Sequence, residues 1–488
     1  MDVIGNRFMI FEDYASYKAS NFSPTVCIVG SGPAGISIAL QLEKQKIPCL
    51  IIEAGGFYRS DEVQDAYRGK VYGDEYLDLD VVRLRCFGGT SGHWAGWCRP
   101  LDEIDFEARI GVKNSGWPIR KKDLDPYSKM VNSILEVKEF PPDKFLDKDL
   151  RETFFEWSPP VRFGEKYRKH IEKSSLINLL INSPIMDIVP AGGKISHINL
   201  YSKTGANQQI SAKYFCLCTG GIENSRLLLW SNQLYNGGVV PETRALGKYW
   251  MEHPIYVTGD SVLFTFAKMR VNNIKHTRFY APTANFLHTH GIGNFGLRVN
   301  TGQNLIKALI KDGLCIAPSF FSTLTRKMDD GLVCSAELRL AWEQVPISAN
   351  RIELSNEKDA LGMPRVNLFW KKQHQDRLTA ETAMKLFGGY LIKENLGRAK
   401  IISWLANGLD YPKDDERITF HHMGGTRMAS TPVEGVVDAN CKVFGMDNLY
   451  IGGSSVFPTG GHCNPTYTIV QLALRLGDHI AQKVAKTI

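Results

Sequence analysis

Three histidines stand in glycine-rich turns near the end of this 488-residue chain, where they could act on a bound molecule. His421 and His422 lie in FHHMGGTRM, and His462 lies in TGGHCNPTY together with Asn464. An imidazole group has a pKa of ~6.5 in model peptides, so it can accept a proton near neutral pH. The sequence therefore predicts a general base in one of these turns. Residue type alone does not choose among the three histidines.

A short buried strand and a helix are expected to position these turns. Residues 449–451 form the strand, and Gly452 and Gly453 make a tight turn at its carboxyl end, where ligands of parallel sheets collect. Asn464 is a favoured N-cap and Pro465 suits a first helical turn, so we expect a helix to begin there. The partial positive charge at the start of that helix would stabilise negative charge on a ligand.

Residues 25–56 predict a dinucleotide-binding unit in which a helix connects two parallel strands. The strands are expected at 26–29 and 49–52 because both are short, continuous apolar runs. Between the first strand and the helix stands a G-x-G-x-x-G motif, formed by Gly30, Gly32 and Gly35. Such glycines allow a tight turn, close approach of a pyrophosphate and close helix packing.

Glu53, at the end of the second strand, would accept hydrogen bonds from a ribose and repel a 2′-phosphate. The motif therefore favours a dinucleotide with a plain ribose, but it does not distinguish NAD from FAD. The same glycine spacing recurs at 291–296 without a buried strand before it or an amphipathic helix after it. We interpret this second match as accidental.

Residues 86–99 (CFGGTSGHWAGWCR) form a further glycine-rich loop. Its glycines permit positive φ and close backbone approach, and Thr90 and Ser91 add hydroxyl groups. Such a loop could wrap a flat, polar ring system without side-chain clashes. A nicotinamide ring needs no such cradle, so the loop favours a flavin.

The segment GGTSGHW resembles the flavin loop of the glucose–methanol–choline (GMC) oxidoreductase family, whose members are FAD enzymes that oxidise alcohols. The pair of His93 and Trp94 is most similar to the pyranose-oxidase branch of that family. In several members a histidine at this place is joined covalently to the flavin methyl carbon, which makes His93 the candidate here. Without such a bond, His93 would form hydrogen bonds near the flavin or pack beneath Trp94.

The resemblance also implies roles in the C-terminal turns. A histidine before Gly-Thr, followed some forty residues later by His or Asn, matches His422 and Asn464. His422 would accept the hydroxyl proton, Asn464 would orient the substrate hydroxyl, and flavin N5 would take the hydride. His421 and His462 are offset from the pattern and are expected to be structural neighbours.

The implied reaction is FAD-dependent oxidation of CH–OH to C=O on a carbohydrate, cyclitol or glycoside, with oxygen or another electron acceptor. The expected cofactor contacts are Gly30, Gly32, Gly35, Glu53, Gly88, Gly89, Thr90, Ser91, Gly92, His93, Trp94, Ala95, Thr219, Gly220, Glu223, Gly453, Ser454, Asn464, Pro465 and Thr466.

The implied fold class is α/β, or α+β overall, with a Rossmann-like FAD-binding domain of the glutathione-reductase type and a discontinuous substrate-binding domain. Residues 177–221 support it because they read as short strands that return to the sheet at Thr219 and Gly220. We expect the FAD-binding domain at 1–110, 165–255 and 412–488. The substrate-binding domain is expected at 111–164 and 256–411.

Composition excludes several other classes of protein. The chain is 43% apolar with a formal net charge of +7 and no long run of like charges, which argues against a nucleic-acid partner. No apolar stretch is long enough for a membrane span, and no secretory signal is evident, so a cytoplasmic location is expected. The ten cysteines are scattered, which predicts buried thiols rather than disulfides or a metal site.

Three alternatives stay open. The enzyme could oxidise an aliphatic, aromatic or sterol alcohol by the same chemistry. It could be one of the family's flavoproteins without net oxidation, such as a lyase or a light-driven decarboxylase. It could also be a non-catalytic subunit, or an NAD-dependent enzyme that uses only the N-terminal motif.

Overall fold

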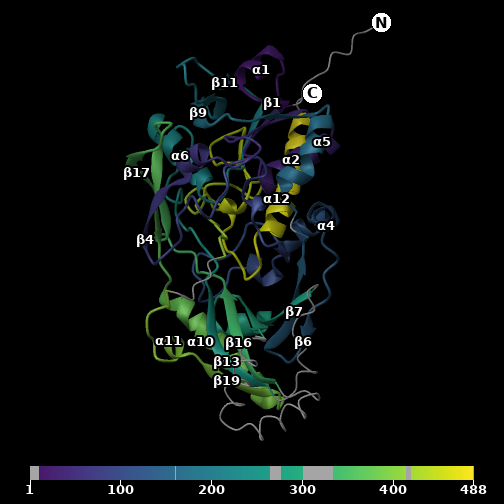
Figure 1. Cartoon of the computed structure of the whole chain (residues 1–488), viewed down its shortest axis with the longest axis vertical. Coiled ribbons are helices and arrows are strands. Elements are labelled where there is room, and N and C mark those ends of the chain that lie inside the picture. Colours follow the sequence, from purple (N-terminus) through teal and green to yellow (C-terminus); the bar gives the residue numbers. More distant parts are fainter. Residues whose placement is uncertain (1–9, 160, 264–275, 301–332, 414–418, 487–488) are drawn as a thin grey trace, which may run out of the picture.

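Two large sheets organise the molecule (Figure 1). The computed structural model describes residues 10–159, 161–263, 276–300, 333–413 and 419–486. A six-stranded parallel sheet lies in one half of the molecule, and an eight-stranded antiparallel sheet lies in the other. The α/β class predicted from the sequence is confirmed.

Apart from Ile10 at the edge and the polar Asn178, the parallel sheet is built from buried apolar residues, as expected for strands covered on both faces. Its order is β1 (Ile10–Phe11), β8 (Ile177–Leu180), β3 (Cys49–Ile52), β2 (Val26–Val29), β12 (Tyr214–Leu217) and β20 (Leu449–Ile451). The three strands predicted at 26–29, 49–52 and 449–451 therefore have the predicted bounds.

Helices cover this sheet and pack on one another. The helices α2 (Pro33–Lys44) and α12 (Thr466–Ala485) cross closely, because a Cβ on Gly477 would lie 2.8 Å from the Cβ of Gln41. The other helices near this sheet are α1 (Tyr14–Ala19), α4 (Ser128–Leu135), α5 (Phe163–Lys173) and α6 (Glu223–Leu234). The contact between α2 and α12 brings the N-terminal and C-terminal glycine-rich turns to the same end of the sheet.

A three-stranded meander connects β8 to β12, as the pattern over 177–221 predicted. It consists of β9 (Ile185–Ala191), β10 (Lys194–Leu200) and β11 (Gln209–Ile210), all antiparallel. The chain then enters β12 and turns into α6 at Glu223.

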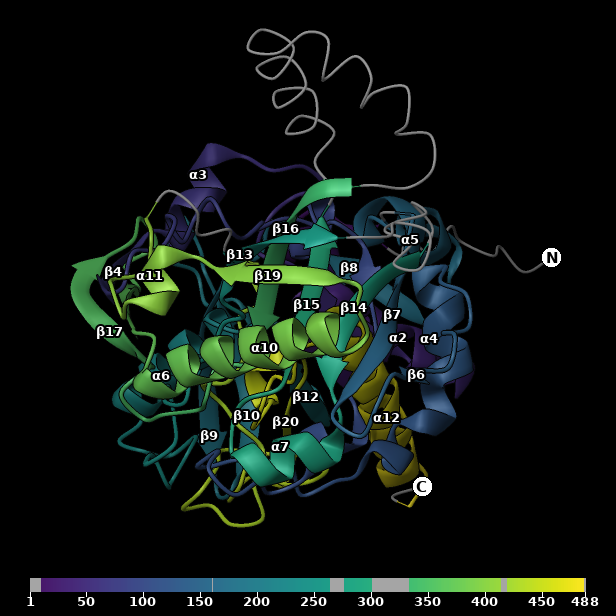
Figure 2. The same ribbon diagram turned by 90° about the horizontal axis from the view of Figure 1, so that it is seen from below.

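The antiparallel sheet has one face against a long helix and the other toward the parallel sheet (Figure 2). The helix is α10 (His374–Lys393), whose Phe387 and Met384 pack on alternate residues of the sheet such as Leu297 and Leu340. The strand order is β19 (Gly397–Ile401), β13 (Ile255–Leu263), β16 (Val333–Trp342), β15 (Phe295–Asn300), β14 (His276–Pro282), β7 (Leu150–Trp157) and β5 (Trp97–Cys98), with β6 (Lys144–Phe145) beside β7.

A third, small sheet joins distant parts of the chain. It is formed by β17 (Arg351–Lys358), β18 (Pro364–Trp370) and β4 (Gly69–Gly73), and β4 runs parallel to β18. Trp250 and Trp370 pack in the core beneath it. In the described ranges, the other α-helices are α3 (Asp61–Gln64), α7 (Ala284–His290) and α11 (Ser403–Ala406).

Three other sequence interpretations can be compared with the structure. Gly291 ends α7 and Gly296 lies within β15, so the second glycine motif has no phosphate-binding geometry. The eight cysteines with described side chains are buried free thiols, and Cys315 and the side chain of Cys334 lie outside the described residues. In the described part of the chain, no helix combines the length and apolarity needed to cross a bilayer.

Candidate active site

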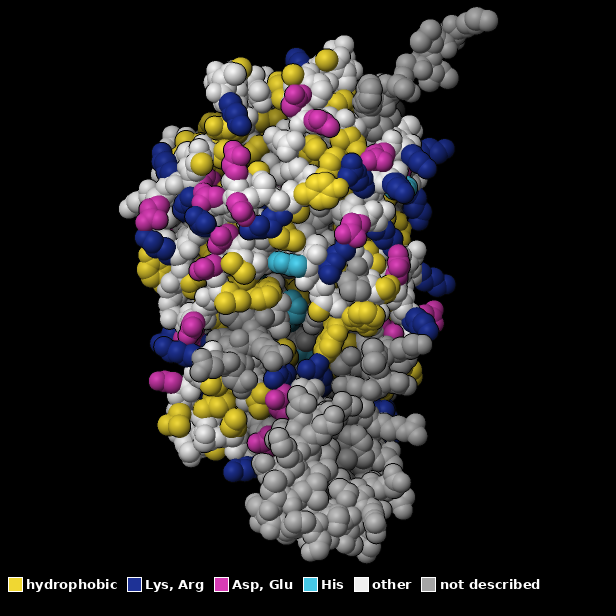
Figure 3. All heavy atoms as spheres, viewed as in Figure 1, with side chains coloured by type: hydrophobic (Ala, Val, Ile, Leu, Met, Phe, Trp, Pro, Cys, Tyr) yellow, Lys and Arg dark blue, Asp and Glu magenta, His cyan; other side chains and the backbone are white. Residues whose placement is uncertain are grey.

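A cavity of about 590 Å³ lies between the carboxyl ends of the parallel strands and the antiparallel sheet. The turns after β2, β3, β12 and β20 contribute Gly30, Glu53, Thr219 and Gly453 to its wall. Figure 3 shows histidine side chains in a hollow at the centre of one face, beside hydrophobic side chains. The volume is in the range typical of ligand and cofactor sites.

Most of the residues predicted from the sequence line this one cavity. Of the expected cofactor contacts, the structure brings together Gly30, Gly32, Glu53, Gly89, Thr90, Ser91, His93, Trp94, Ala95, Thr219, Gly220, Glu223, Gly453, Ser454, Asn464, Pro465 and Thr466. His422 lines the same cavity, and so do His421 and His462. Segments more than 400 residues apart in the sequence therefore share one site.

Gly35, Gly88 and Gly92 do not line the cavity, but two of them shape its wall. A Cβ on Gly35 would lie 2.0 Å from the carbonyl oxygen of Gly30, so α2 can approach the glycine turn only without a side chain there. Gly88 has φ +91°, and a Cβ there would lie 2.3 Å from the backbone nitrogen of Gly164. The close approach of the neighbouring backbone therefore requires glycine at both positions.

The first glycine turn has the geometry needed for a pyrophosphate. Gly32 is the N-cap of α2, receives no side-chain cap, and has nothing within 4 Å of the position where a Cβ would stand. The first backbone N–H groups of α2 therefore face open space, where they could bind an anion. Glu53 accepts hydrogen bonds from the backbone and hydroxyl of Ser31, at 3.2 and 2.6 Å, which fixes its carboxylate at the cavity wall.

The loop at 86–99 is held from outside the cavity. The Trp94 indole nitrogen donates to the carbonyl of Val161 at 3.0 Å, and the Ser91 hydroxyl accepts from the backbone N–H of Phe163 at 3.1 Å. His93 lies at the cavity edge, where partial burial and then the charge of Arg162 lower its pKa. A neutral imidazole at this point is available as a nucleophile or hydrogen-bond partner.

Glu223 is part of a buried ion-pair cluster that the sequence did not reveal. Its carboxylate lies 2.9 Å from Arg83, 3.2 Å from Arg226 and 3.8 Å from Arg85, and Arg226 also contacts Asp359 at 2.6 Å. Although burial opposes it, the attraction of the three arginines keeps the Glu223 pKa below its usual value. The alternation of Arg83 and Arg85 just before the glycine loop is the signal that could have indicated them.

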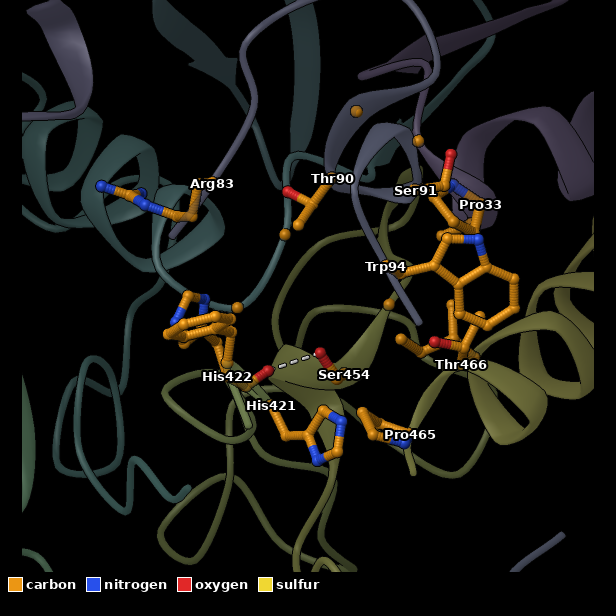
Figure 4. A pocket seen from close by; sticks show the side chains of 18 of the residues that line it. Pro33, Arg83, Thr90, Ser91, Trp94, His421, His422, Ser454, Pro465 and Thr466 are labelled. Atoms are coloured by element: carbon orange, nitrogen blue, oxygen red, sulfur yellow. Dashed lines mark hydrogen bonds between the residues drawn. The ribbon is translucent and has the colours of Figure 1, made fainter. Parts of the chain in front are cut away.

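The two adjacent histidines have different surroundings (Figure 4). The ring of His421 points toward Pro465, whereas the ring of His422 turns toward the side of Arg83. His421 Nδ1 lies 3.0 Å from His253 Nδ1. His422 Nε2 lies 2.9 Å from the Tyr76 hydroxyl, and that hydroxyl donates to Glu252 at 2.7 Å.

Glu252 connects these two histidines. Its carboxylate also accepts hydrogen bonds from the Thr419 hydroxyl at 2.7 Å and from the backbone of His253 and His421, both at 2.8 Å. Burial raises the pKa of Glu252 to about 7. The hydrogen bonds oppose this shift, because they stabilise the ionised form.

The buried histidines are neutral at physiological pH. Burial lowers the pKa of His422 to about 3 and that of His253 to about 4, and it lowers the pKa of His421 well below the usual value. His462 has a pKa of about 3 for the same reason, although Asp102, whose carboxylate lies 3.8 Å away, acts in the opposite direction. A neutral imidazole is the form that can accept a proton.

The helix that was expected to open with Asn464 and Pro465 begins after both residues. The helical hydrogen bonds start at Thr466, Pro465 is the cap residue, and no side chain caps this end of α12. The prediction that Asn464 caps the helix was therefore wrong, because the cap position is one residue later, at Pro465. The side chain of Asn464 lines the cavity instead and makes no hydrogen bond within the described residues.

Known proteins resemble this chain over most of its length. A family model described as GMC oxidoreductase matches residues 346–473. The 2-methyl-1,2-propanediol dehydrogenase of Mycolicibacterium austroafricanum is 22% identical, over 94% of this chain and 95% of its own length. The C-glycoside 3-oxidase of Microbacterium trichothecenolyticum is 27% identical, over 81% of this chain and 75% of its own length.

The fold comparison agrees with these matches. Pyridoxine 4-oxidase from Mesorbium loti superposes with a TM-score of 0.58 at 14% identity, covering 94% of this chain and 99% of that one. The fold predicted from the family resemblance is thereby confirmed. In sequence and in fold the chain is similar to known oxidases and dehydrogenases, and its residues 346–473 match the GMC oxidoreductase model.

Proposed function

We propose that this enzyme oxidises a secondary or primary hydroxyl of a carbohydrate, cyclitol or glycoside to a carbonyl, at the end of the cavity where His421, His422 and Asn464 meet. The single observation that carries the proposal is the convergence of two neutral histidines and one asparagine on the cavity that the glycine-rich turns line. The resemblance to the pyranose-oxidase branch and the match to a C-glycoside 3-oxidase support a sugar-like substrate.

The cavity fits FAD through residues already described. The N-terminal turn of α2 would hold the pyrophosphate, Glu53 the ribose, and the loop at 88–97 together with the start of α12 the ring system. When bound, FAD supplies the hydride acceptor for the C–H bond that breaks. The protein must supply the base for the O–H proton, so that carbon and oxygen form the carbonyl bond.

His421 is the base that the contacts favour, in preference to the His422 predicted from sequence spacing. Since the Tyr76 hydroxyl donates its hydrogen to Glu252, His422 Nε2 acts as the donor to Tyr76, and only Nδ1 of this ring keeps a lone pair. His422 therefore acts as a positioning residue in this proposal. Its ring also lies against Trp250, away from Pro465.

The hydrogen bond between His421 and His253 favours a tautomer of His421 in which Nε2 carries no hydrogen. His253 Nε2 is buried without a hydrogen-bond partner in the described part of the chain, and burial lowers the pKa of His253, whereas the nearby backbone at Gly460 and Gly461 raises it. If the ring hydrogen of His253 is on Nε2, His253 Nδ1 accepts from His421 Nδ1–H, and His421 Nε2 keeps its lone pair. Asn464 would then hold the hydroxyl oxygen while His421 takes the proton.

The activity can be tested by mixing the enzyme with each candidate substrate without oxygen. Reduction of the bound FAD is then measured as the loss of its visible absorption. The panel should contain sugars, cyclitols and glycosides, with 1,2-propanediol, benzyl alcohol and a sterol as non-sugar alcohols. We expect at least one sugar-like compound to reduce FAD faster than every non-sugar alcohol. Faster reduction by a non-sugar alcohol would contradict the substrate class but not the chemistry.

Two variants test the base. His421→Asn is expected to slow FAD reduction by at least a hundredfold with FAD still bound, because removal of a general base typically costs about 10²–10⁴-fold. His422→Asn is expected to cost less. His479→Asn, on the far part of α12 beside Tyr450, is the matched control and should leave the rate unchanged. A larger loss in His422→Asn would restore the sequence-based assignment.

A further inference from the structure

Two arginines lie directly opposite each other on the cavity face of the antiparallel sheet. In the register of β15 and β16, Arg298 pairs with Arg339, and both side chains line the cavity. The residues on either side in the strands, such as Leu297 and Leu340, point to the opposite face and pack under α10. Like charges in directly opposed cross-strand positions are destabilising, with Cβ atoms about 5 Å apart.

The described neighbours of this pair supply one carboxylate. Glu337, two residues before Arg339 and on the same face, accepts from Nε of Arg339 at 3.1 Å and from Nη2 at 3.0 Å. Both contacts use the same carboxylate oxygen, which also accepts from Asn300 at 3.1 Å. On the other side of β16, the residue opposite Arg339 is the apolar Val257.

The two guanidinium groups are also held in place. Arg339 is 9% exposed, and its Nη1 makes no hydrogen bond in the part of the chain that the structure describes. Arg298 lies over the ring of Trp97, 4.9 Å from the ring centroid, and has a further partner of its own. A fixed pair of guanidinium groups that lines the cavity, with the Nη1 donor of Arg339 unused within the described residues, suits the binding of a carboxylate or a phosphate.

The spacing along the strands places this pair relative to the reacting end of the cavity. Gly296 and Ala341 are the preceding opposed pair on the same face, and a Cβ on Gly296 would lie 2.9 Å from the ring of His462. Two residues along a strand advance about 7 Å. The arginine pair therefore lies roughly 7 Å beyond the point where the sheet contacts His462, which is two residues from Asn464.

We propose that the substrate is an anionic polyhydroxy compound, whose carboxylate or phosphate binds between Arg298 and Arg339 while a hydroxyl several carbons away is oxidised. This inference rests on the proposed function and narrows its substrate class. The spacing along the strands favours a substrate whose hydroxyl stands several carbons from the anionic group over one such as lactate, in which the two are adjacent. It suits a six-carbon sugar acid or a sugar phosphate.

The test compares D-glucuronate and D-glucose 6-phosphate with neutral D-glucose at matched ionic strength. In the wild-type holoenzyme, we expect one of the two anions to reach half-maximal FAD reduction at a concentration at least tenfold lower than D-glucose does. The anion that needs the lower concentration shows whether the site prefers a carboxylate or a phosphate. Equal concentrations for the neutral and the anionic probes would overturn the proposal.

Four variants locate the effect. Arg298→Gln and Arg339→Gln are each expected to raise the concentration for half-maximal FAD reduction about ten- to hundredfold for the anionic probe. For D-glucose, the rise should be less than twofold. Glu337→Gln should lower that concentration for the anionic probe, because it removes the carboxylate that pairs with Arg339. Arg278 lies on β14, pairs with Glu152 and does not line the cavity. As a control, Arg278→Gln should change the concentration for half-maximal FAD reduction for neither the anionic probe nor D-glucose. An equal loss for charged and neutral probes would contradict anion binding.

A binding measurement separates this proposal from the proposed function. The melting temperature of the holoenzyme should rise with the anionic probe in the wild type and not in Arg298→Gln. If no alcohol reduces FAD but this rise is seen, the anion site stands and the proposed function fails. If D-glucose reduces FAD and neither anion binds better, the anion site fails. Should Arg339→Gln be unstable, the Arg339→Gln, Glu337→Gln double variant removes both charges together.

Discussion

Two glycines of the same motif should respond in opposite ways to the addition of one methyl group. Gly32 has φ −73° and open space where a Cβ would stand, so Gly32→Ala meets no steric conflict within the protein. Gly35→Ala would place its Cβ 2.0 Å from the Gly30 carbonyl oxygen. The first change therefore extends into the cavity, and the second forces α2 away from the sheet.

The magnitudes follow from these contacts. For Gly32→Ala we expect the unfolding free energy of the FAD-free protein to change by less than about 1 kcal/mol, because the loss of an N-cap glycine and the gain in backbone stiffness nearly cancel. Its FAD dissociation constant should rise at least tenfold, about 1.4 kcal/mol, because the methyl group occupies the pyrophosphate path. Gly35→Ala should cost about 1–3 kcal/mol in stability or more, with FAD binding lost as a consequence.

Thermal unfolding of the FAD-free variants and titration of FAD by fluorescence quenching measure the two quantities separately. Alanine at Gly220, where φ is +97° and the surroundings are open, serves as a control for backbone strain at the cavity wall. Normal FAD affinity in Gly32→Ala would refute the placement of the pyrophosphate at α2. Normal stability in Gly35→Ala would refute the close packing of the helix.

Three further predictions concern the cofactor bond and the effect of pH. If His93 is joined to FAD, acid precipitation should leave the yellow colour in the pellet of the wild type and in the supernatant for His93→Ala; colour in the wild-type supernatant would exclude the bond. Burial raises the pKa of Asp376, beside Trp342 in the core, to about 7. Folding thus favours its protonated form. The free energy of unfolding is therefore highest below a pH of about 4, and the contribution of Asp376 to it falls by about 4 kcal/mol as pH rises to 7. In Asp376→Asn, thermal unfolding should show this loss removed; an unchanged pH dependence would contradict it. Glu252, with a pKa of about 7 and a hydrogen bond from Tyr76, should make FAD reduction faster as pH rises through 7, and Glu252→Gln should show a flat profile with FAD still bound.

The parallel strands and their turns could be predicted from the sequence because each depends on local signals. Residues 26–29 are a continuous apolar run followed at once by glycines, and residues 449–451 have the same form. The G-x-G-x-x-G motif carries its own geometric requirement, which Gly35 meets by packing on Gly30. In such segments the residue types and the local backbone agree, so no distant contact is needed to recognise them.

The features that could not be predicted depend on contacts between distant residues. Glu223 meets Arg83 from 140 positions away, and nothing near Glu223 in the sequence indicates that partner. The pairing of Arg298 with Arg339 depends on the register of two strands, and a shift of either strand by one residue would move its arginine to the helix face. The directions of the His421 and His422 rings depend in the same way on Tyr76 and His253.

The shared strands limit how the molecule can admit a substrate. Strand β4, from the first hundred residues, completes a sheet with β18, and β5 completes the large antiparallel sheet beside β7. Rotating the two halves apart would break these backbone ladders, which register five residue pairs between β4 and β18 and two between β5 and β7. We therefore expect entry and product release through side-chain and loop rearrangements at the mouth of the cavity, and separate expression of the two halves should fail to reconstitute the enzyme.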